Sequence, residues 1–145
     1  MMTKKLLMLV CSVMLVFGAC SSTKDKATDN AKIFNIEWKM QSVKAKDNNS
    51  LVIPQPEKMP TMTIATDGTS VSGYAGCNRY SGPVTIKGAK VTFGALAATK
   101  MFCMDSMDVE SALFNAFAEA DSYALVNGEL LLKKGNVTLA TFAVQ

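Results

Sequence analysis

Sulfur-bearing side chains crowd one short stretch of this 145-residue sequence. The thioethers of Met101, Met104 and Met107 surround the thiol of Cys103. Soft sulfur ligands select Cu(I), so these four side chains could form a copper site. Methionine is also a common filler of irregular gaps in protein cores, and core packing is the simpler interpretation of the same residues. We therefore expect no metal and no other cofactor.

The thiols of Cys77 and Cys103 form a second chemical pair. The sequence has four cysteines, but Cys11 lies in an apolar run and Cys20 has a separate role described below. An even pair of thiols in an exported protein is typical of a disulfide. Such a bond would close a loop of about 27 residues and stabilise the fold by roughly 3 to 4 kcal/mol. Two close reduced thiols are the alternative, favoured in an anaerobic organism without strong export oxidants.

A polar loop follows Cys77. Asn78, Arg79 and Tyr80, together with Lys100 farther along, could form a patch that binds a small ligand or an envelope protein. Asparagine tolerates the left-handed backbone of tight loops, and Arg79 is the only arginine. A guanidinium can clamp carbonyl or carboxylate groups. The alternative is that this loop only braces the fold.

The sequence contains no histidine. This absence removes the usual general base, the commonest metal ligand and every Ser-His or Cys-His nucleophile pair. Because no other catalytic constellation is visible, we expect a protein that is not an enzyme. The net charge of +3 falls to about +1 without Lys4 and Lys5, and the remaining lysines are scattered. We therefore expect no binding to nucleic acid.

The amino terminus has the layout of a signal peptide. Two lysines precede an apolar run, Leu6 to Phe17, and two small residues precede Cys20. As a helix the run would reach only about 18 Å, whereas a bilayer core needs about 30 Å. The stretch before Cys20 resembles a lipobox, so we expect residues 1–19 to be cleaved and Cys20 to carry the lipid that anchors the chain to a membrane. An ordinary secretory signal with an incidental cysteine is the alternative.

The remainder divides into a tether and one domain. Residues 20–32 start with Cys20 and continue without a large apolar side chain until the end of the segment, which is typical of a flexible linker. Residues 33–145 are the size of one domain with a single core. Ser21, directly after Cys20, favours the outer membrane of a Gram-negative bacterium under the enterobacterial sorting rule. We expect a monomer in the cell envelope.

Alternating apolar and polar residues predict a series of strands joined by tight turns. The expected strands cover residues 36–43, 61–65, 69–74, 84–86, 89–93, 122–126, 129–133 and 137–144. Trp38 is expected to be a core anchor. Asp67-Gly68 predicts a hairpin with a type I′ turn, and Asn127-Gly128 predicts another turn. Neighbouring hairpins of this number tend to curl into a barrel, which removes exposed edges.

One helix is predicted, over residues 107–120. Val109, Leu113, Phe114 and Phe117 form an apolar stripe that would face the core. Asp105 or Ser106 can cap its start, and the first turn carries Asp108 and Glu110, which suit the positive end of a helix. The fold class is therefore mainly β (α+β), with a partly open antiparallel β-barrel or meander and one helix.

Several of these segments together resemble the META domain family, which includes the heat-inducible envelope protein HslJ. The resemblance rests on Gly76-Cys77-Asn78-Arg79, on Phe-Gly-x-Leu-Ala-x-Thr-x-Met-x-Cys from Phe93 to Cys103, on the acidic Phe-rich helix and on the Trp38 strand. It implies a small, partly open barrel with one helix, often carried on secreted lipoproteins. It also implies an association with envelope stress and, for HslJ, with novobiocin resistance. The family brings no established catalytic residue.

Three functions follow as expectations. The first is a non-enzymatic, membrane-anchored envelope lipoprotein of the META (HslJ-like) type, acting in stress tolerance by binding a partner or small molecule. The second is soft-metal or thiol redox handling by Met101, Cys103, Met104 and Met107. The third is inhibition of a hydrolase that attacks the envelope, with a loop around Arg79 plugging its active site.

Overall fold

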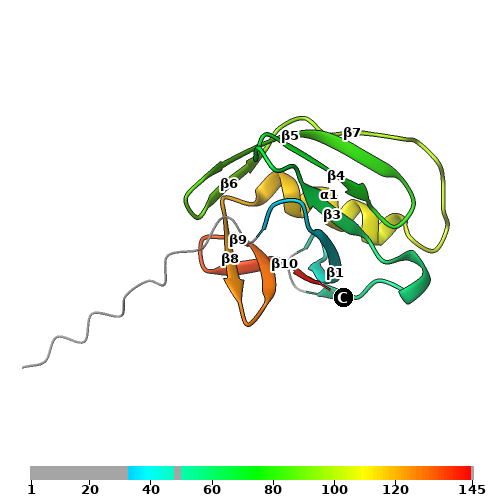
Figure 1. Ribbon diagram of the computed structural model, residues 1–145. Coiled ribbons are helices and arrows are strands. Elements are labelled where there is room, and N and C mark those ends of the chain that lie inside the picture. Colours follow the sequence, from blue (N-terminus) through cyan, green and yellow to red (C-terminus); the bar gives the residue numbers. More distant parts are fainter. Residues whose placement is uncertain (1–32, 48–49, 145) are drawn as a thin grey trace, which may run out of the picture.

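The computed structural model describes residues 33–47 and 50–144 of the chain (Figure 1). The predicted signal peptide (1–19), the lipid-bearing Cys20 and the tether (20–32) lie outside the described residues. The elements in chain order are β1 (Glu37–Lys44), β2 (Leu51–Val52), the 3-10 turn η2 (Pro56–Lys58), β3 (Thr61–Ile64), β4 (Ser70–Tyr74), β5 (Arg79–Lys87), β6 (Lys90–Phe93), β7 (Ala97–Ala98), α1 (Met107–Glu119), β8 (Ser122–Val126), β9 (Glu129–Lys134) and β10 (Val137–Ala143). The predicted mainly β fold with a single α-helix is confirmed for these residues.

Eight strands close into an antiparallel barrel. Their order is β1-β3-β4-β5-β6-β8-β9-β10, and β10 pairs back onto β1. The short strands β2 and β7 lie outside the ring and pair with β1 and β5 respectively. The thinnest joint lies between β6 and β8, which pair through Lys90 and Ser122 and are supported by a 2.9 Å bond from Tyr123 N to Ala89 O. The predicted partly open barrel therefore closes, and it closes narrowly at this joint.

The barrel interior is filled by side chains at alternate strand positions, because successive Cβ atoms point to opposite faces of a strand. In β1, Trp38 and Met40 are buried. The indole Nε1 of Trp38 donates a hydrogen bond to the carbonyl oxygen of Ile33 at 3.1 Å, which satisfies its one polar atom inside the core. The prediction that Trp38 anchors the core is confirmed, and Ile33 is fixed where the described chain begins.

Helix α1 lies against the barrel strands β1, β6, β9 and β10. Figure 1 shows it between the green strands of the first half and the orange and red strands of the second. Its ring of Phe117 packs on Phe93 at 4.6 Å and on Tyr80 at 5.3 Å between centroids. Among the described residues no helix is long and apolar enough to cross a bilayer.

The start of α1 differs from the prediction of a side-chain cap. Ser106 occupies the N-cap position, but its hydroxyl makes no capping hydrogen bond. The carboxylate of Asp105 instead accepts a hydrogen bond from the Nζ of Lys58 at 3.5 Å. The predicted N-cap position at Ser106 is confirmed, but neither side chain caps the helix, because the Ser106 hydroxyl is buried without a hydrogen-bond partner among the described residues and Asp105 pairs with the segment before β3.

The two predicted turns have different geometries. Asn127 and Gly128 have φ values of 52° and 85°, the two positive angles that a type I′ turn needs. At Asp67-Gly68 the hairpin is confirmed, but the predicted type I′ turn is wrong because only Gly68 has a positive φ, of 68°. The carboxylate of Asp67 accepts a 3.0 Å bond from the Thr69 amide, and such a local bond favours a longer loop in which the glycine alone is left-handed.

Candidate functional site

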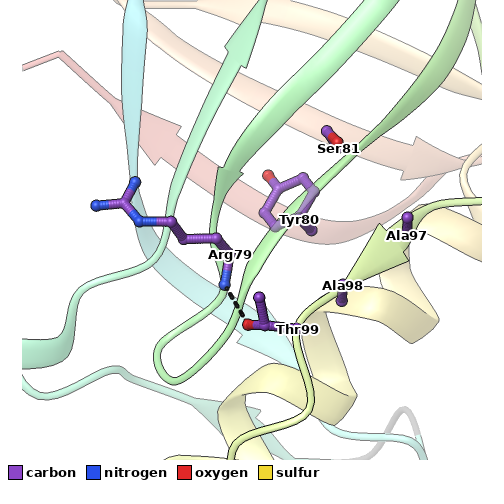
Figure 2. Close-up of a pocket in the computed structure, with 6 residues that line it drawn as sticks. All are labelled: Arg79, Tyr80, Ser81, Ala97, Ala98 and Thr99. Atoms are coloured by element: carbon purple, nitrogen blue, oxygen red, sulfur yellow. Dashed lines mark hydrogen bonds between the residues drawn. The ribbon is translucent and has the colours of Figure 1, made fainter.

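The polar loop expected after Cys77 is shorter than predicted, because β5 already begins at Arg79. Tyr80 pairs with Gly73 of β4 on one side and with Ala98 of β7 on the other. Strand alternation then sends Arg79 outward and Tyr80 inward, as Figure 2 shows. The Gly-Ser-Pro composition of residues 79–83 is typical of a loop, and pairing with two distant strands overrides it.

Arg79 and Tyr80 border an open depression of about 330 Å³ beside β7. Its lining residues are Arg79, Tyr80, Ser81, Ala97, Ala98 and Thr99. The backbone N–H of Arg79 donates to the Thr99 hydroxyl at 3.3 Å, while the guanidinium extends away from Ala97 and Ala98 (Figure 2). The depression is shallow and small side chains form much of its wall, so it offers few groups to hold a ligand.

Asn78 is buried, and its side-chain amide makes four hydrogen bonds within the chain. Its Nδ2 donates to Glu110 Oε1 at 2.8 Å and to the Met101 carbonyl at 3.0 Å. Its Oδ1 accepts from the Thr99 hydroxyl and from the Met101 amide, both at 2.7 Å. A side-chain amide has two donor hydrogens and two acceptor lone pairs, so all of its capacity is used. Asn78 therefore holds neighbouring segments together and has no bond left for a ligand.

Glu110 belongs to this site, although the sequence prediction gave it no role there. Its predicted place in the first turn of the helix is confirmed, and only 7% of it is exposed. Its carboxylate accepts from both the backbone N and the side-chain Nδ2 of Asn78, each at 2.8 Å. One signal could have found it: Glu110 lies three and seven residues before Leu113 and Phe117, on the apolar face of the helix.

Cys77 and Cys103 form a disulfide, with Cα atoms 5.8 Å apart. Of the two predicted alternatives, the structure therefore has the oxidised pair. The bond joins the turn between β4 and β5 to the segment that precedes α1. Together with Asn78, which follows Cys77 directly, it ties this segment to the barrel at two neighbouring points.

Both interpretations of the methionine cluster need correction. The disulfide takes up the thiol of Cys103, so the predicted copper set lacks its thiolate. Met101 and Met104 are 57% and 84% exposed, so the core-packing interpretation is wrong for them as well. Met107, the first residue of α1, is half-buried. These thioethers face solvent because the disulfide and Asn78 hold their segment at the outside of the barrel.

An apolar loop is the result, and we use this name for residues 99–104. Phe102 is 78% exposed between the exposed Met101 and Met104. Residues 99–103 form no helix, strand or turn, although the segment is tied to the barrel by the Met101 backbone before Phe102 and by the Cys103 side chain after it. Large apolar side chains gathered on a surface are typical of an interaction site. This loop is therefore the strongest candidate for a contact surface among the described residues.

The apolar loop lies at the end of the barrel opposite to the point where the described chain begins. Phe34 bridges to Ile64, the last residue of β3. Thr61, the first residue of β3, pairs with Tyr74, which leads directly to the loop of Cys77. In Figure 1 the blue start of the described chain accordingly lies to the left of the yellow segment before α1.

The four residues of the predicted polar patch do not share one surface. Asn78 and Tyr80 are buried, and only Arg79 and Lys100 are exposed. The hydroxyl of Tyr80 donates to the Thr61 carbonyl at 2.9 Å, and burial raises the pKa of Tyr80. For Asn78 and Tyr80 the bracing role, which was the alternative interpretation, describes what their side chains do.

The family model described as META domain matches residues 31–145 of the chain. A solved NMR structure of a protein from Burkholderia xenovorans is similar, with a TM-score of 0.64 and 27% identity over 79% of this chain and 84% of that one. A second solved NMR structure has a TM-score of 0.59 and 20% identity over 78% of this chain and 92% of its own, which is a likeness of fold alone. No curated protein matches the sequence.

Proposed function

Because the chain belongs to the META domain family, we propose that it is a non-enzymatic binding module, anchored by lipid in the cell envelope and acting in stress tolerance. The observation that carries the proposal is the apolar loop, in which Met101, Phe102 and Met104 are exposed on a braced segment. A loop that is already ordered loses less conformational entropy when a partner binds it, so binding keeps more of the contact energy. The loop is the surface with which the protein meets its partner.

Binding without catalysis is supported by the chemistry of the chain. The sequence has no histidine, and the thiols of the site are joined in a disulfide. The side-chain amide of Asn78 is hydrogen-bonded within the chain, and the hydroxyl of Tyr80 donates to the Thr61 carbonyl inside the barrel. The residues around the loop therefore position its backbone and leave Met101, Phe102 and Met104 as the groups a partner would touch.

The membrane anchor is supported by the residues before Cys20 and by the disulfide, a bond that persists mainly in oxidising compartments. The proposed site is the outer membrane of a Gram-negative bacterium. Because the described chain begins at the barrel end opposite to the apolar loop, an anchor at Cys20 favours a loop that faces away from the lipid.

Metabolic labelling with radioactive palmitate tests the anchor. The full chain should take up label and sediment with membranes, and Cys20→Ser should lose both properties. Cys11→Ser is the matched control, because it removes a thiol from the same apolar region and should leave the labelling unchanged. Label that persists in the Cys20→Ser variant would contradict the anchor.

Survival under stress tests the binding role. In a strain that lacks the chromosomal copy, wild-type protein should restore growth under heat or envelope stress. A variant with Met101, Phe102 and Met104 all changed to serine should fold and localise normally but fail to restore growth. Full restoration by this variant would exclude the apolar loop as the functional surface.

A further inference from the structure

Phe102 makes no hydrogen bond to the described residues and lies between two residues that are held in place by hydrogen bonds and a disulfide. The backbone N–H and C=O of Met101 are both bound by the Asn78 side chain, at 2.7 and 3.0 Å. Cys103 is fixed by its disulfide, and its carbonyl accepts a 3.1 Å bond from the Ser106 amide. The N–H and C=O of Phe102 itself bond to no other described residue, and its side chain is 78% exposed. Side chain and backbone are thus offered to a partner together.

This combination fits the substrate cleft of a protease. Such a cleft pairs with the backbone of a bound segment and takes one side chain into a pocket, so the backbone contacts give affinity and the pocket gives specificity. A hydrophobic S1 pocket of the chymotrypsin kind accepts a large apolar side chain. We propose that the apolar loop is an inhibitory loop for a serine endopeptidase with an apolar S1 pocket, which Phe102 occupies. The proposal names the partner class of the binding role proposed above and rests on it.

The disulfide gives a reason why such a complex would persist. Attack of the enzyme's serine hydroxyl on the Phe102 carbonyl carbon would form an ester and break the amide bond to the Cys103 nitrogen, which takes up the hydroxyl proton. The bond from Cys103 to Cys77 holds the new amine beside the ester. The amine can then attack the ester, restore the peptide bond and return the proton to serine, in competition with hydrolysis by water.

Charge around the loop favours a protein partner over a lipid surface. The exposed carboxylate of Asp108, in the first turn of α1, would be repelled by anionic headgroups, whereas that of Asp105 is paired with Lys58. Lys100 is exposed just before Phe102, but it is the only basic residue within residues 99–104, so the loop presents no positive face to anionic headgroups. Its position at the barrel end opposite to Phe34, the second described residue, also directs it away from a membrane that holds the amino terminus.

Inhibition assays with two probe enzymes, α-chymotrypsin and subtilisin, test the proposal. The full chain, purified in mild detergent, should inhibit at least one of them competitively against a chromogenic peptide substrate. Loss of a central anchor side chain costs more than about 2 kcal/mol at a binding hot spot, so Phe102→Ala should weaken inhibition by at least about 30-fold. Val126→Ala, at an exposed valine at the end of β8, should change nothing.

A change of specificity makes the test stringent. Phe102→Lys should transfer inhibition from chymotrypsin to trypsin, whose S1 pocket carries an aspartate. Because Phe102 is exposed, both variants should keep the wild-type melting temperature, and this measurement separates loss of contact from loss of fold. Intact mass after long incubation should show mostly uncleaved chain.

Three results would overturn the proposal. They are absence of inhibition of both probe enzymes, rapid cleavage of the loop as an ordinary substrate, and equal inhibition by wild type and Phe102→Ala. Binding to phosphatidylglycerol vesicles that requires Phe102, without inhibition, would assign the loop to a membrane instead. Inhibition by a chain that fails to take up palmitate would refute the anchor alone and leave this inference standing.

Discussion

Replacing Asn78 with alanine removes four side-chain hydrogen bonds at one buried point. Three join neutral groups, for which the net contribution to stability is about 1 kcal/mol each, and the bond to the Glu110 carboxylate contributes about 1.5 to 3 kcal/mol. Asn78→Ala should therefore lower the free energy of unfolding by about 5 kcal/mol. A domain of this size has a free energy of unfolding of roughly 6 to 17 kcal/mol, so a loss of this size would remove between about a third and nearly all of it.

Urea unfolding followed by Trp38 fluorescence measures this loss, because the only tryptophan is 2% exposed in the folded protein. With an m-value of about 1.5 kcal/mol per molar urea, the midpoint should fall by about 3 M. Thr99→Val removes, at nearly constant volume, one of the four bonds of Asn78 and the bond that the Thr99 hydroxyl accepts from the Arg79 amide, and it should cost only about 2 kcal/mol.

Ser106→Ala is the matched control. The Ser106 hydroxyl is buried and has no hydrogen-bond partner among the described residues. Its removal should leave the stability within about 1 kcal/mol of wild type, because no bond is lost. If Asn78→Ala also stays within about 1 kcal/mol, or if Ser106→Ala costs as much as Asn78→Ala, the bracing role of the Asn78 amide is refuted.

Three further predictions concern stability. The double change Cys77→Ser/Cys103→Ser opens a loop of about 27 residues and should lower the free energy of unfolding by about 3.5 kcal/mol, whereas adding a reductant to this variant should change nothing further. A hydrogen bond from the Ser122 hydroxyl holds the pKa of Asp121 below its usual value. The contribution of Asp121 to stability is therefore present above about pH 4 and is lost as the pH falls through the lower pKa of the folded state. In thermal melts between pH 2 and 6, Asp121→Asn should make the melting temperature depend less on pH. Burial raises the pKa of Tyr80, so its contribution to stability is complete below about pH 10 and is lost above it. Alkaline unfolding should coincide with the part of the tyrosinate absorbance change that Tyr80→Phe removes, and Tyr80→Phe should move unfolding to higher pH.

Each of these predictions has a contrary outcome. Equal stability of wild type and the double serine variant would mean that the disulfide constrains little in the unfolded chain. An unchanged acid limb in Asp121→Asn would assign acid sensitivity to other carboxylates. Tyrosinate absorbance that rises well before unfolding in the wild type and is missing in Tyr80→Phe would show that Tyr80 ionises in the folded barrel.

Local patterns in the sequence predicted the elements whose structure depends on residues nearby in the sequence. The strands after the helix were predicted closely, because alternation and the Asn127-Gly128 turn act within a few residues. The helix was predicted for the same reason. Residues 79–83 and β7 were missed, since their strand conformation depends on pairing between segments far apart in the chain and their composition is typical of loops.

The site was harder to predict because its decisive bonds are long-range. Asn78 and Glu110 are 32 residues apart, and no local rule joins a loop amide to a helix carboxylate. Cysteine counting did predict the Cys77–Cys103 bond. Hydropathy placed Met101 and Met104 inside, where apolar residues normally lie. Their exposure follows from bonds that fix their backbone, which side-chain hydropathy does not register.

The pairing of β1 with β10 sets an order of events in folding. These strands lie at the two ends of the described chain. Strand β1, which leaves a ribosome or an export channel first, therefore cannot pair with β10 until the last strand has emerged. Contacts between distant residues form slowly because a long loop must close first. Until then β1 has one open edge, and the side chains of Met40 and Val43 lack part of their cover. Joining the two ends is therefore the step at which the domain becomes complete, and truncation by even one strand at the carboxyl end should leave the whole ring unfinished.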